Sequence, residues 1–431
     1  MVAGISLGYL ITTSPVVAQI TLDGTVPTNI TRSGNVWEIT GGAQAGSNLF
    51  HSFSQFSVPT GNAAYFNNAP LIENIFSRVT GSSASEIDGL SRANGTANLF
   101  LLNPNGILFG SNARLDIGGS FTASTSDRIV FADGTQFKVT DTASQPLLTI
   151  STPLGVQHGI QASGAINNAG NLAVKPNANI TLFGTTVTST GQLVAPGGTV
   201  QVLGDRIALL DNALIDVSAP GGGGTVLIGG DYQGKGTVPN ASRSFVGQDV
   251  TINADALGSG NGGRVIVWSD ESTRFYGEIS ARGGTQSGNG GFVEVSGKSF
   301  LDYAGVADLS AIQGQIGTLL LDPTNITVVA GANNPAELAA NDQFADPGVN
   351  NTITNGTLNA APANVILQAT NNITFNAPVN ILTPGSFQIK QKSVPFLLEE
   401  MRAISISERG NCRFGMEQKS LPHLSRGMLA T

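Results

Sequence analysis

Gly197-Gly-Thr-Val-Gln-Val-Leu-Gly-Asp205 is a phrase that the chain repeats from residues 223, 262 and 290. In each copy a glycine pair precedes apolar residues at alternating positions, the pattern of a turn that leads into a half-buried strand. The other copies are Gly223-Gly-Thr-Val-Leu-Ile-Gly-Gly-Asp231, Gly262-Gly-Arg-Val-Ile-Val-Trp-Ser-Asp270 and Gly290-Gly-Phe-Val-Glu-Val-Ser-Gly-Lys298. The copies begin 26, 39 and 28 residues apart, which indicates a solenoid with one coil per repeat.

The segments that follow these phrases also alternate apolar residues with small polar ones. They include Ala213-Leu-Ile-Asp-Val-Ser-Ala219, Gly277-Glu-Ile-Ser-Ala281 and Gly305-Val-Ala-Asp-Leu-Ser-Ala311. Because successive side chains of a strand point to opposite faces, one face should be buried and the other wet. Stacked parallel coils bury such faces against the next coil. We predict an all-β parallel solenoid; a β-sandwich is the alternative, but it would not need a glycine corner in every repeat.

The composition favours many short strands and excludes several classes of protein. The 431 residues include 55 glycines and 19 prolines, while 40% are hydrophobic and 12% are charged. Disordered chains combine low hydrophobicity with high charge, and helices avoid frequent glycine. The net charge of −8 and the lack of a basic stripe exclude nucleic acid as a partner. The single cysteine, Cys412, excludes an intrachain disulfide framework.

The sequence contains no familiar catalytic or metal-binding motif. Zinc-protease, P-loop and nucleophile-elbow signatures are absent, and the glycine-rich stretch 258–263 is not followed by the helix of a dinucleotide site. The histidines are few and scattered: His51, His158 and His423. We therefore predict a protein that is not an enzyme and that needs no cofactor or metal.

A secreted carbohydrate-active enzyme, either a polysaccharide lyase or a glycosidase, is the alternative function, because some β-helices have these activities. Glycoside hydrolysis needs two carboxylates about 5 to 9.5 Å apart. The best candidates are Asp205, Asp211, Asp216 and Asp231. Asp205 and Asp231 close equivalent phrases and Lys298 takes that place in a later one, which favours a structural turn role.

The stretch Asn98-Leu-Phe-Leu-Leu-Asn-Pro-Asn-Gly-Ile-Leu-Phe-Gly110 places a polar turn between two apolar, strand-like runs. Pro104 presets φ for a turn, the asparagines beside it can bond nearby backbone groups, and Gly106 tolerates a left-handed conformation. The turn alone is ordinary turn chemistry. The turn becomes informative because of its position: it lies about a hundred residues into a repetitive β chain that begins with an apolar leader.

Together these features resemble the N-terminal secretion domain of filamentous haemagglutinin-like exoproteins of the two-partner secretion pathway. Asn103-Pro-Asn-Gly-Ile107 matches the NPNGI motif of that family, and Asn68-Ala-Pro-Leu71 approximates its NPNL motif. The resemblance implies a right-handed parallel β-helix with an N-terminal β-helical secretion domain, capped by short extra strands. It also implies export by an outer-membrane transporter with POTRA domains. The product would be a secreted or cell-surface adhesin that passes through the periplasm and binds host-cell, surface or carbohydrate ligands.

The resemblance assigns transporter recognition to the residues of the two motifs. They are Asn103, Pro104, Asn105, Gly106, Ile107, Asn68, Pro70 and Leu71. An extended segment can add a strand to an exposed sheet edge of a receptor, where main-chain hydrogen bonds give affinity and side-chain pockets give specificity.

The chain is predicted to have four parts. Residues 1–18 are expected to be a signal peptide, because an apolar run is followed by small residues before Gln19, although no Lys or Arg precedes Arg32. An apolar first strand is the alternative. Residues 19–160 are expected to form the secretion domain, and residues 161–389 the β-helix repeats.

The last part, residues 390–431, loses glycine and gains charge. This change predicts an out-of-frame or disordered tail, with a short amphipathic element at 394–406 as the alternative. Apart from the leader, no run reaches the roughly 18 apolar residues of a spanning helix, so we predict that the protein is not an integral membrane protein.

Overall fold

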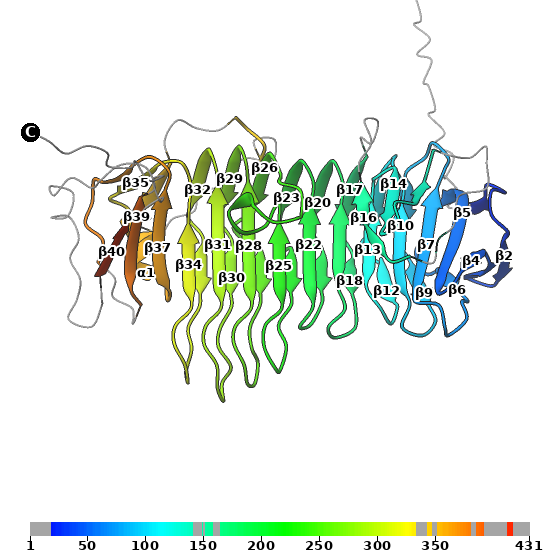
Figure 1. Ribbon diagram of the computed structural model, residues 1–431, viewed down its shortest axis with the longest axis horizontal. Coiled ribbons are helices and arrows are strands. Elements are labelled where there is room, and N and C mark those ends of the chain that lie inside the picture. The colour runs from blue at the N-terminus through cyan, green and yellow to red at the C-terminus, as the bar shows by residue number, and fades with distance from the viewer. Residues whose placement is uncertain are drawn as a thin grey trace, which may run out of the picture.

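The computed structural model is an elongated stack of coils built almost entirely from parallel strands (Figure 1). It describes residues 19–140, 149, 151–157, 164–332, 343–346, 351–380, 385–391 and 412–416. A typical coil contributes one strand to each of three long sheets, which we call A, C and B in the order in which the chain visits them. The predicted parallel β-helix is confirmed, and the β-sandwich alternative is wrong.

Sheet A has 15 strands and extends along the whole stack. Its members are β1 (Ile20–Leu22), β4 (Ala43–Ala45), β5 (Asn48–Phe56), β7 (Asn74–Val79), β10 (Asn98–Leu102), β13 (Phe121–Ser124), β19 (Ile180–Phe183), β22 (Thr199–Leu203), β25 (Thr225–Ile228), β28 (Arg264–Ser269), β31 (Phe292–Gly297), β34 (Thr318–Leu321), β37 (Asn364–Ala369), β39 (Phe387–Gln391) and β40 (Cys412–Met416).

Sheets B and C complete the coils. Sheet B has 11 strands: β2 (Thr28–Ser33), β3 (Val36–Gly41), β6 (Ala63–Phe66), β9 (Leu90–Ala93), β12 (Arg114–Asp116), β18 (Asn171–Ala173), β21 (Gln192–Val194), β24 (Leu214–Asp216), β27 (Thr251–Asn253), β30 (Glu278–Ser280) and β33 (Val306–Asp308). Sheet C has eight: β8 (Ser85–Ile87), β11 (Ile107–Phe109), β17 (Ala165–Asn168), β20 (Thr186–Ser189), β23 (Arg206–Leu209), β26 (Arg243–Val246), β29 (Ser272–Phe275) and β32 (Phe300–Tyr303).

Two small sheets and two short helices lie outside this pattern. Sheet D comprises β14 (Arg128–Phe131), β15 (Gln136–Lys138) and β16 (Pro153–Gln157), and the other sheet comprises β35 (Ile326–Val329), β36 (Thr352–Thr354) and β38 (Ile373–Phe375). The helices are the 3-10 turn η1 (Tyr232–Gly234) and α1 (Asn355–Ala360). Among the described residues, no helix is long and apolar enough to cross a membrane.

The repeated glycine-valine phrase determines how the coils stack. Its first valines pair in register from β22 to β31 and all are fully buried: Val200, Val226, Val265 and Val293. The glycines before them lie against the backbone of another segment. A Cβ on Gly262 would lie 2.0 Å from the Ala281 carbonyl oxygen, so only glycine fits at this corner.

The N-terminal end of the stack is closed by antiparallel strands. β1 and β4 both pair with β5, and β2 pairs with β3. These short strands cover the first coil, which would otherwise expose its core and its unpaired edges. The predicted cap of short extra strands is confirmed.

The outer face of sheet A is covered in two places, although the repeat pattern predicts one wet face. Near the N-terminus, sheet D packs against Phe50, Phe76 and Leu102 and buries them completely. Further along, the segment around η1 lies over Leu227, Ile266 and Trp268. Glu294 on this second face is fully buried, and desolvation raises the pKa of its carboxyl to about 7.

The coils run without a break across the predicted boundary near residue 160, because β13 pairs directly with β19 and β11 with β17. The predicted boundary at residue 389 falls inside β39, which ends at Gln391. Residues 1–18 and most of 390–431 lie outside the described residues, although β40 pairs with β39 in parallel.

Candidate functional site

The Asn103–Gly106 turn leads from β10 of sheet A to β11 of sheet C. The Gly106 amide donates to the Asn103 carbonyl oxygen at 3.1 Å and closes the turn, with Gly106 at φ 122°. The Asn103 side chain is fully buried. Its Nδ2 donates to the carbonyl oxygen of Ser83 and to Oγ of Ser85, each at 3.0 Å, so it ties this turn to the preceding coil.

The other residues of this motif differ in exposure. Oδ1 of Asn103 accepts a hydrogen bond from the Asn105 amide at 3.0 Å, and the exposed Asn105 side chain donates to the Gly81 carbonyl oxygen at 2.7 Å. Pro104 is half-buried. Ile107 is 1% exposed and starts β11, where it pairs with Ser85 and Ile166. The motif is therefore built into the stack, with only its tip in solvent.

The Asn68–Leu71 turn leads from β6 of sheet B to β7 of sheet A. Asn68 is 5% exposed, and its Oδ1 accepts a hydrogen bond from the Asn94 amide of the next coil at 2.8 Å. The Ile72 amide donates to the Ala69 carbonyl oxygen at 3.0 Å. Pro70 is exposed, and Leu71 is 85% exposed.

The structure does not bring the two predicted motifs to one corner, because they occupy different corners of the coil. The first lies between sheets A and C, and the second lies between sheets B and A. They share a structural device: in each, the first asparagine is buried and bonds to a neighbouring coil. They differ in the apolar residue that follows, which is buried in the first motif and exposed in the second.

A family model described as the TPS secretion domain matches residues 18–234, which include both turns and the first repeats of the stack. The chain belongs to this family. Its members are two-partner secretion exoproteins, which are secreted by a partner transporter and are typically not enzymes. The HMW1 secretion domain from Haemophilus influenzae is a similar solved structure, with 22% sequence identity, a TM-score of 0.32 and coverage of 70% of this chain and 98% of that one. No curated protein matches the chain.

Arg78 is a residue of this TPS secretion domain whose role the sequence pattern did not reveal. It is fully buried, and its Nε donates to Oγ of Ser52 at 2.8 Å. Its guanidinium also donates to the Lys138 carbonyl oxygen and to Oγ1 of Thr25, and it lies 4.7 Å from the centre of the Phe137 ring. Arg78 thereby joins the N-terminal cap, the coil and sheet D.

Asp23 extends this network of the secretion domain. Burial by itself would raise the pKa of its carboxyl, but hydrogen bonds from Ser52, Thr25 and Thr80 outweigh burial and lower the pKa below the ordinary value. The carboxylate therefore stays ionised near the buried Arg78. The network could have been noticed only from Arg78 itself, the one charged residue of the strand β7.

The histidine that the structure describes at this end is part of the packing. His51 is 1% exposed, and its Nδ1 lies 3.1 Å from Oγ1 of Thr28. Burial lowers the pKa of its imidazole to about 4, so the ring is neutral at physiological pH. His158 and His423 lie outside the described residues.

The four carboxylates proposed for glycan cleavage have separate structural surroundings in the TPS-family chain. Asp205 accepts a hydrogen bond from Ser242, and Asp211 occupies a left-handed turn position at φ 51°. Asp216 accepts from the Ser218 amide at 2.9 Å, and Asp231 caps η1 and pairs with Arg264 at 2.6 Å. Among the described residues, no group of three or more His, Cys, Asp or Glu side chains could hold a metal ion.

Proposed function

We propose that the two asparagine turns carry recognition by an outer-membrane transporter with POTRA domains, and that the exported chain acts as a surface adhesin. The observation that supports this most is the contrast in exposure at the turns. The recognition set is Asn103, Pro104, Asn105, Gly106, Ile107, Asn68, Pro70 and Leu71. In this proposal the protein passes through the periplasm and is secreted or held at the cell surface.

The burial of each residue determines whether the transporter can contact it before folding only, or also after folding. Asn103 is fully buried and uses both atoms of its amide inside the stack, so a partner can contact it directly only before that coil closes. Leu71 is 85% exposed and is accessible before and after folding. Strand addition to a receptor edge suits the first case, because an unfolded segment still has free backbone donors and acceptors.

In this proposal the predicted parts of the chain act one after another during export. Residues 1–18 would direct the chain to the periplasm, and residues 19–160 would engage the transporter. Residues 161–389 would then add coils outside, each stacking on the one before, because a solenoid is stabilised by nearest-neighbour contacts. Apart from the end of β39 and the strand β40, which belong to sheet A, residues 390–431 would form a tail outside this stack.

Two features support an adhesive rather than an enzymatic role. The coils stack regularly, with apolar residues in register, and the candidate carboxylates have separate surroundings. The aspartates proposed for catalysis are engaged in turns, a cap and an ion pair. Long loops project from one edge of the stack in its middle part and offer a broad surface for contact (Figure 1). Attachment of cells that display the chain to a host-cell or glycan-coated surface, compared with cells lacking it, tests the adhesive part.

Export of two matched variants tests whether the motif is read before folding. Asn103→Ala changes the motif itself. Gly164→Ala leaves the motif unchanged but strains the same folded turn, since a Cβ there would lie 2.4 Å from the Pro104 carbonyl oxygen. We expect Asn103→Ala to lose cross-linking to the transporter in cells and Gly164→Ala to keep it. Equal loss in both variants would show that the transporter reads the folded turn, and undiminished export of both would refute the proposed role of Asn103.

A further inference from the structure

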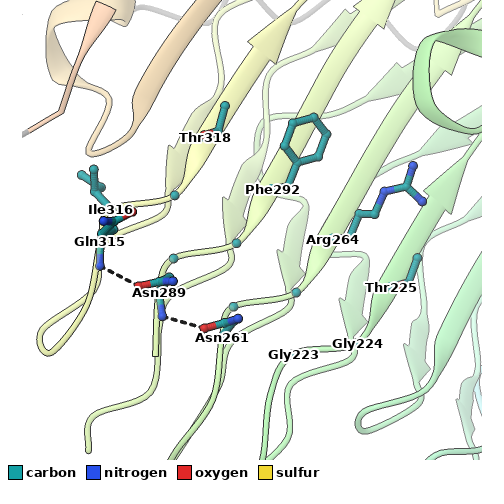
Figure 2. Close-up of a pocket in the computed structure, with 15 residues that line it drawn as sticks. Gly223, Gly224, Thr225, Asn261, Arg264, Asn289, Phe292, Gln315, Ile316 and Thr318 are labelled. Atoms are coloured by element: carbon teal, nitrogen blue, oxygen red, sulfur yellow. Dashed lines mark hydrogen bonds between the residues drawn. The ribbon is translucent and has the colours of Figure 1, made fainter. Parts of the chain in front are cut away.

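An open trough crosses the corners where the chain returns from sheet B to sheet A in four consecutive coils (Figure 2). Its volume is about 490 Å³, and fifteen residues from the starts of β25, β28, β31 and β34 and the loops before them line it. It lies beyond residue 234, where the matched secretion domain ends, except at its first corner.

The floor of the trough is bare backbone for a reason internal to the fold. A Cβ on Gly290 would lie 1.9 Å from the Leu309 carbonyl oxygen, and one on Gly262 would lie 2.0 Å from that of Ala281. Close packing therefore requires these glycines whether or not anything binds. The side chains of the two walls decide what the trough can hold.

One wall is a row of outward-facing residues that lie in register at the start of four strands of sheet A. They are Thr225, Arg264, Phe292 and Thr318. They face outward because the valine or leucine after each of them is fully buried in the core. This wall offers hydroxyl groups, a guanidinium group and an aromatic ring.

The opposite wall is a ladder of amides. The side-chain Oδ1 of Asn261 accepts a hydrogen bond from the backbone N–H of Asn289, and Oδ1 of Asn289 accepts one from the backbone N–H of Gln315, each at 2.8 Å (Figure 2). Asn261 and Asn289 are both exposed. Their side-chain Nδ2 groups donate no hydrogen bond to any residue that the structure describes. The ladder therefore presents amide donors at the spacing of the coils.

The trough has little net charge. None of the fifteen residues that line it is acidic, and its one cation, Arg264, pairs with Asp231 at 2.6 Å. Phe292 stands in the wall with the ring of Tyr232 edge-on to it at 5.8 Å, and Tyr232 is 41% exposed. The site thus combines neutral hydrogen-bonding groups with aromatic surface.

We propose that this trough binds a neutral, extended glycan chain along the axis of the stack; this rests on the proposed adhesive function and names its ligand class. Amides and hydroxyls match sugar hydroxyls, and an aromatic ring packs against the apolar face of a sugar ring. Neighbouring coils are about 4.8 Å apart, close to the length of one sugar unit, so each coil meets one unit. With no acidic residue in the walls, the glycan is held and not cleaved.

Calorimetric titration of the purified, folded chain with cello-, malto- and chito-oligosaccharides of two to six units tests the proposal. Affinity for at least one series should rise with length up to about four units, the number of coils crossed, and then level off. The proposal fails if no neutral series binds, if affinity does not depend on length, or if a sulfated glycan or an extended peptide binds in their place.

A matched pair of variants locates the binding. Asn289→Ala should weaken glycan binding about tenfold, because it removes an amide donor of the wall. Asn179→Ala is the control: its Oδ1 likewise accepts a backbone hydrogen bond from the next coil, from Thr199 at 2.8 Å, but it lies outside the trough. Equal glycan affinity in the two variants would overturn the trough as the site.

These measurements separate the inference from the proposed function. Titration uses purified protein, so it does not depend on the transporter or on display at the cell surface. Cells that still attach to a surface while the purified chain ignores every glycan would leave the adhesive function standing and remove the trough as its ligand site. Glycan binding by a chain that mediates no attachment would do the reverse.

Discussion

The two asparagine turns of the secretion domain look alike in sequence and differ in what the folded chain does with their last residue. In Asn103–Ile107 the final isoleucine enters the core as the start of β11 and is 1% exposed. In Asn68–Leu71 the leucine is 85% exposed, and the neighbouring Ile72 supplies the buried side chain at 2% exposure. In the folded chain a partner can therefore reach Leu71 but not Ile107.

The first asparagines of the two turns, unlike the last residues, behave alike in the folded chain. Asn103 and Asn68 are both buried and both bond to a neighbouring coil, so the fold alone explains why an amide stands at each position. The presence of the two asparagines is therefore explained by the stacking of the coils, and their proposed part in recognition is a separate contribution. Variants of the two turns can separate these two contributions.

The largest loss of stability in this comparison is expected for Asn103→Ala. It leaves the Ser83 carbonyl oxygen and the Asn105 amide without their partner in a buried corner, which costs about 2 to 3 kcal/mol. Chemical denaturation of the purified chain, followed by circular dichroism, measures the effect. Asn105→Ala is the control, since its side chain is exposed and its loss should cost about 1 kcal/mol or less. Equal losses would mean that burial does not distinguish the two asparagines.

A smaller loss, about 1 to 2 kcal/mol, is expected for Asn68→Ala. Its Oδ1 accepts one good hydrogen bond from the Asn94 backbone amide, but the single bond from its Nδ2 to the Asn94 carbonyl oxygen is long, at 3.3 Å, and the side chain is 5% exposed. The same denaturation experiment ranks it against Asn103→Ala. A loss as large as that of Asn103→Ala would contradict the view that the second turn is the looser of the two.

The stacking of the repeats could be predicted because a single constraint fixes it. The phrase with two glycines and alternating valines places Val200, Val226 and Val265 in one buried column, and the structure pairs them in register. The interval of 39 residues between the second and third phrases has a local cause. The segment around η1 leaves the coil there and lies over Trp268 before the chain rejoins sheet C.

The covers of sheet A could not be predicted, because they depend on contacts between distant segments. Phe131 and Phe137 lie in irregular sequence, and only the fold shows that they pack on Phe50 and Phe76. Glu294 occupies a position that alternation makes solvent-facing, yet it is buried. The exposure of Leu71 likewise depends on how β6 leads into β7. The motif residues could be listed from the sequence, but not which of them the fold leaves accessible.

The smallest effect on stability, and the most informative for recognition, is expected for Leu71→Ser. Because the side chain is 85% exposed, its replacement should change the free energy of unfolding by no more than about 0.5 kcal/mol. Export through the partner transporter should nevertheless fall severalfold, measured as the secreted fraction of the chain in cells that carry both proteins. Stability and export then separate in this one variant, as they cannot in Asn103→Ala.

Leu257→Ser is the matched control for that experiment. Leu257 is 56% exposed in one of the long loops and lies outside the matched secretion domain, so its replacement changes a similar apolar side chain without touching either turn. Secretion of the Leu257 variant should equal that of the parent chain. If the Leu71 variant is also secreted normally, the exposed side chain of the second turn has no part in recognition. Contact of the transporter with Asn103 before its coil folds is then the one part of the proposal that remains.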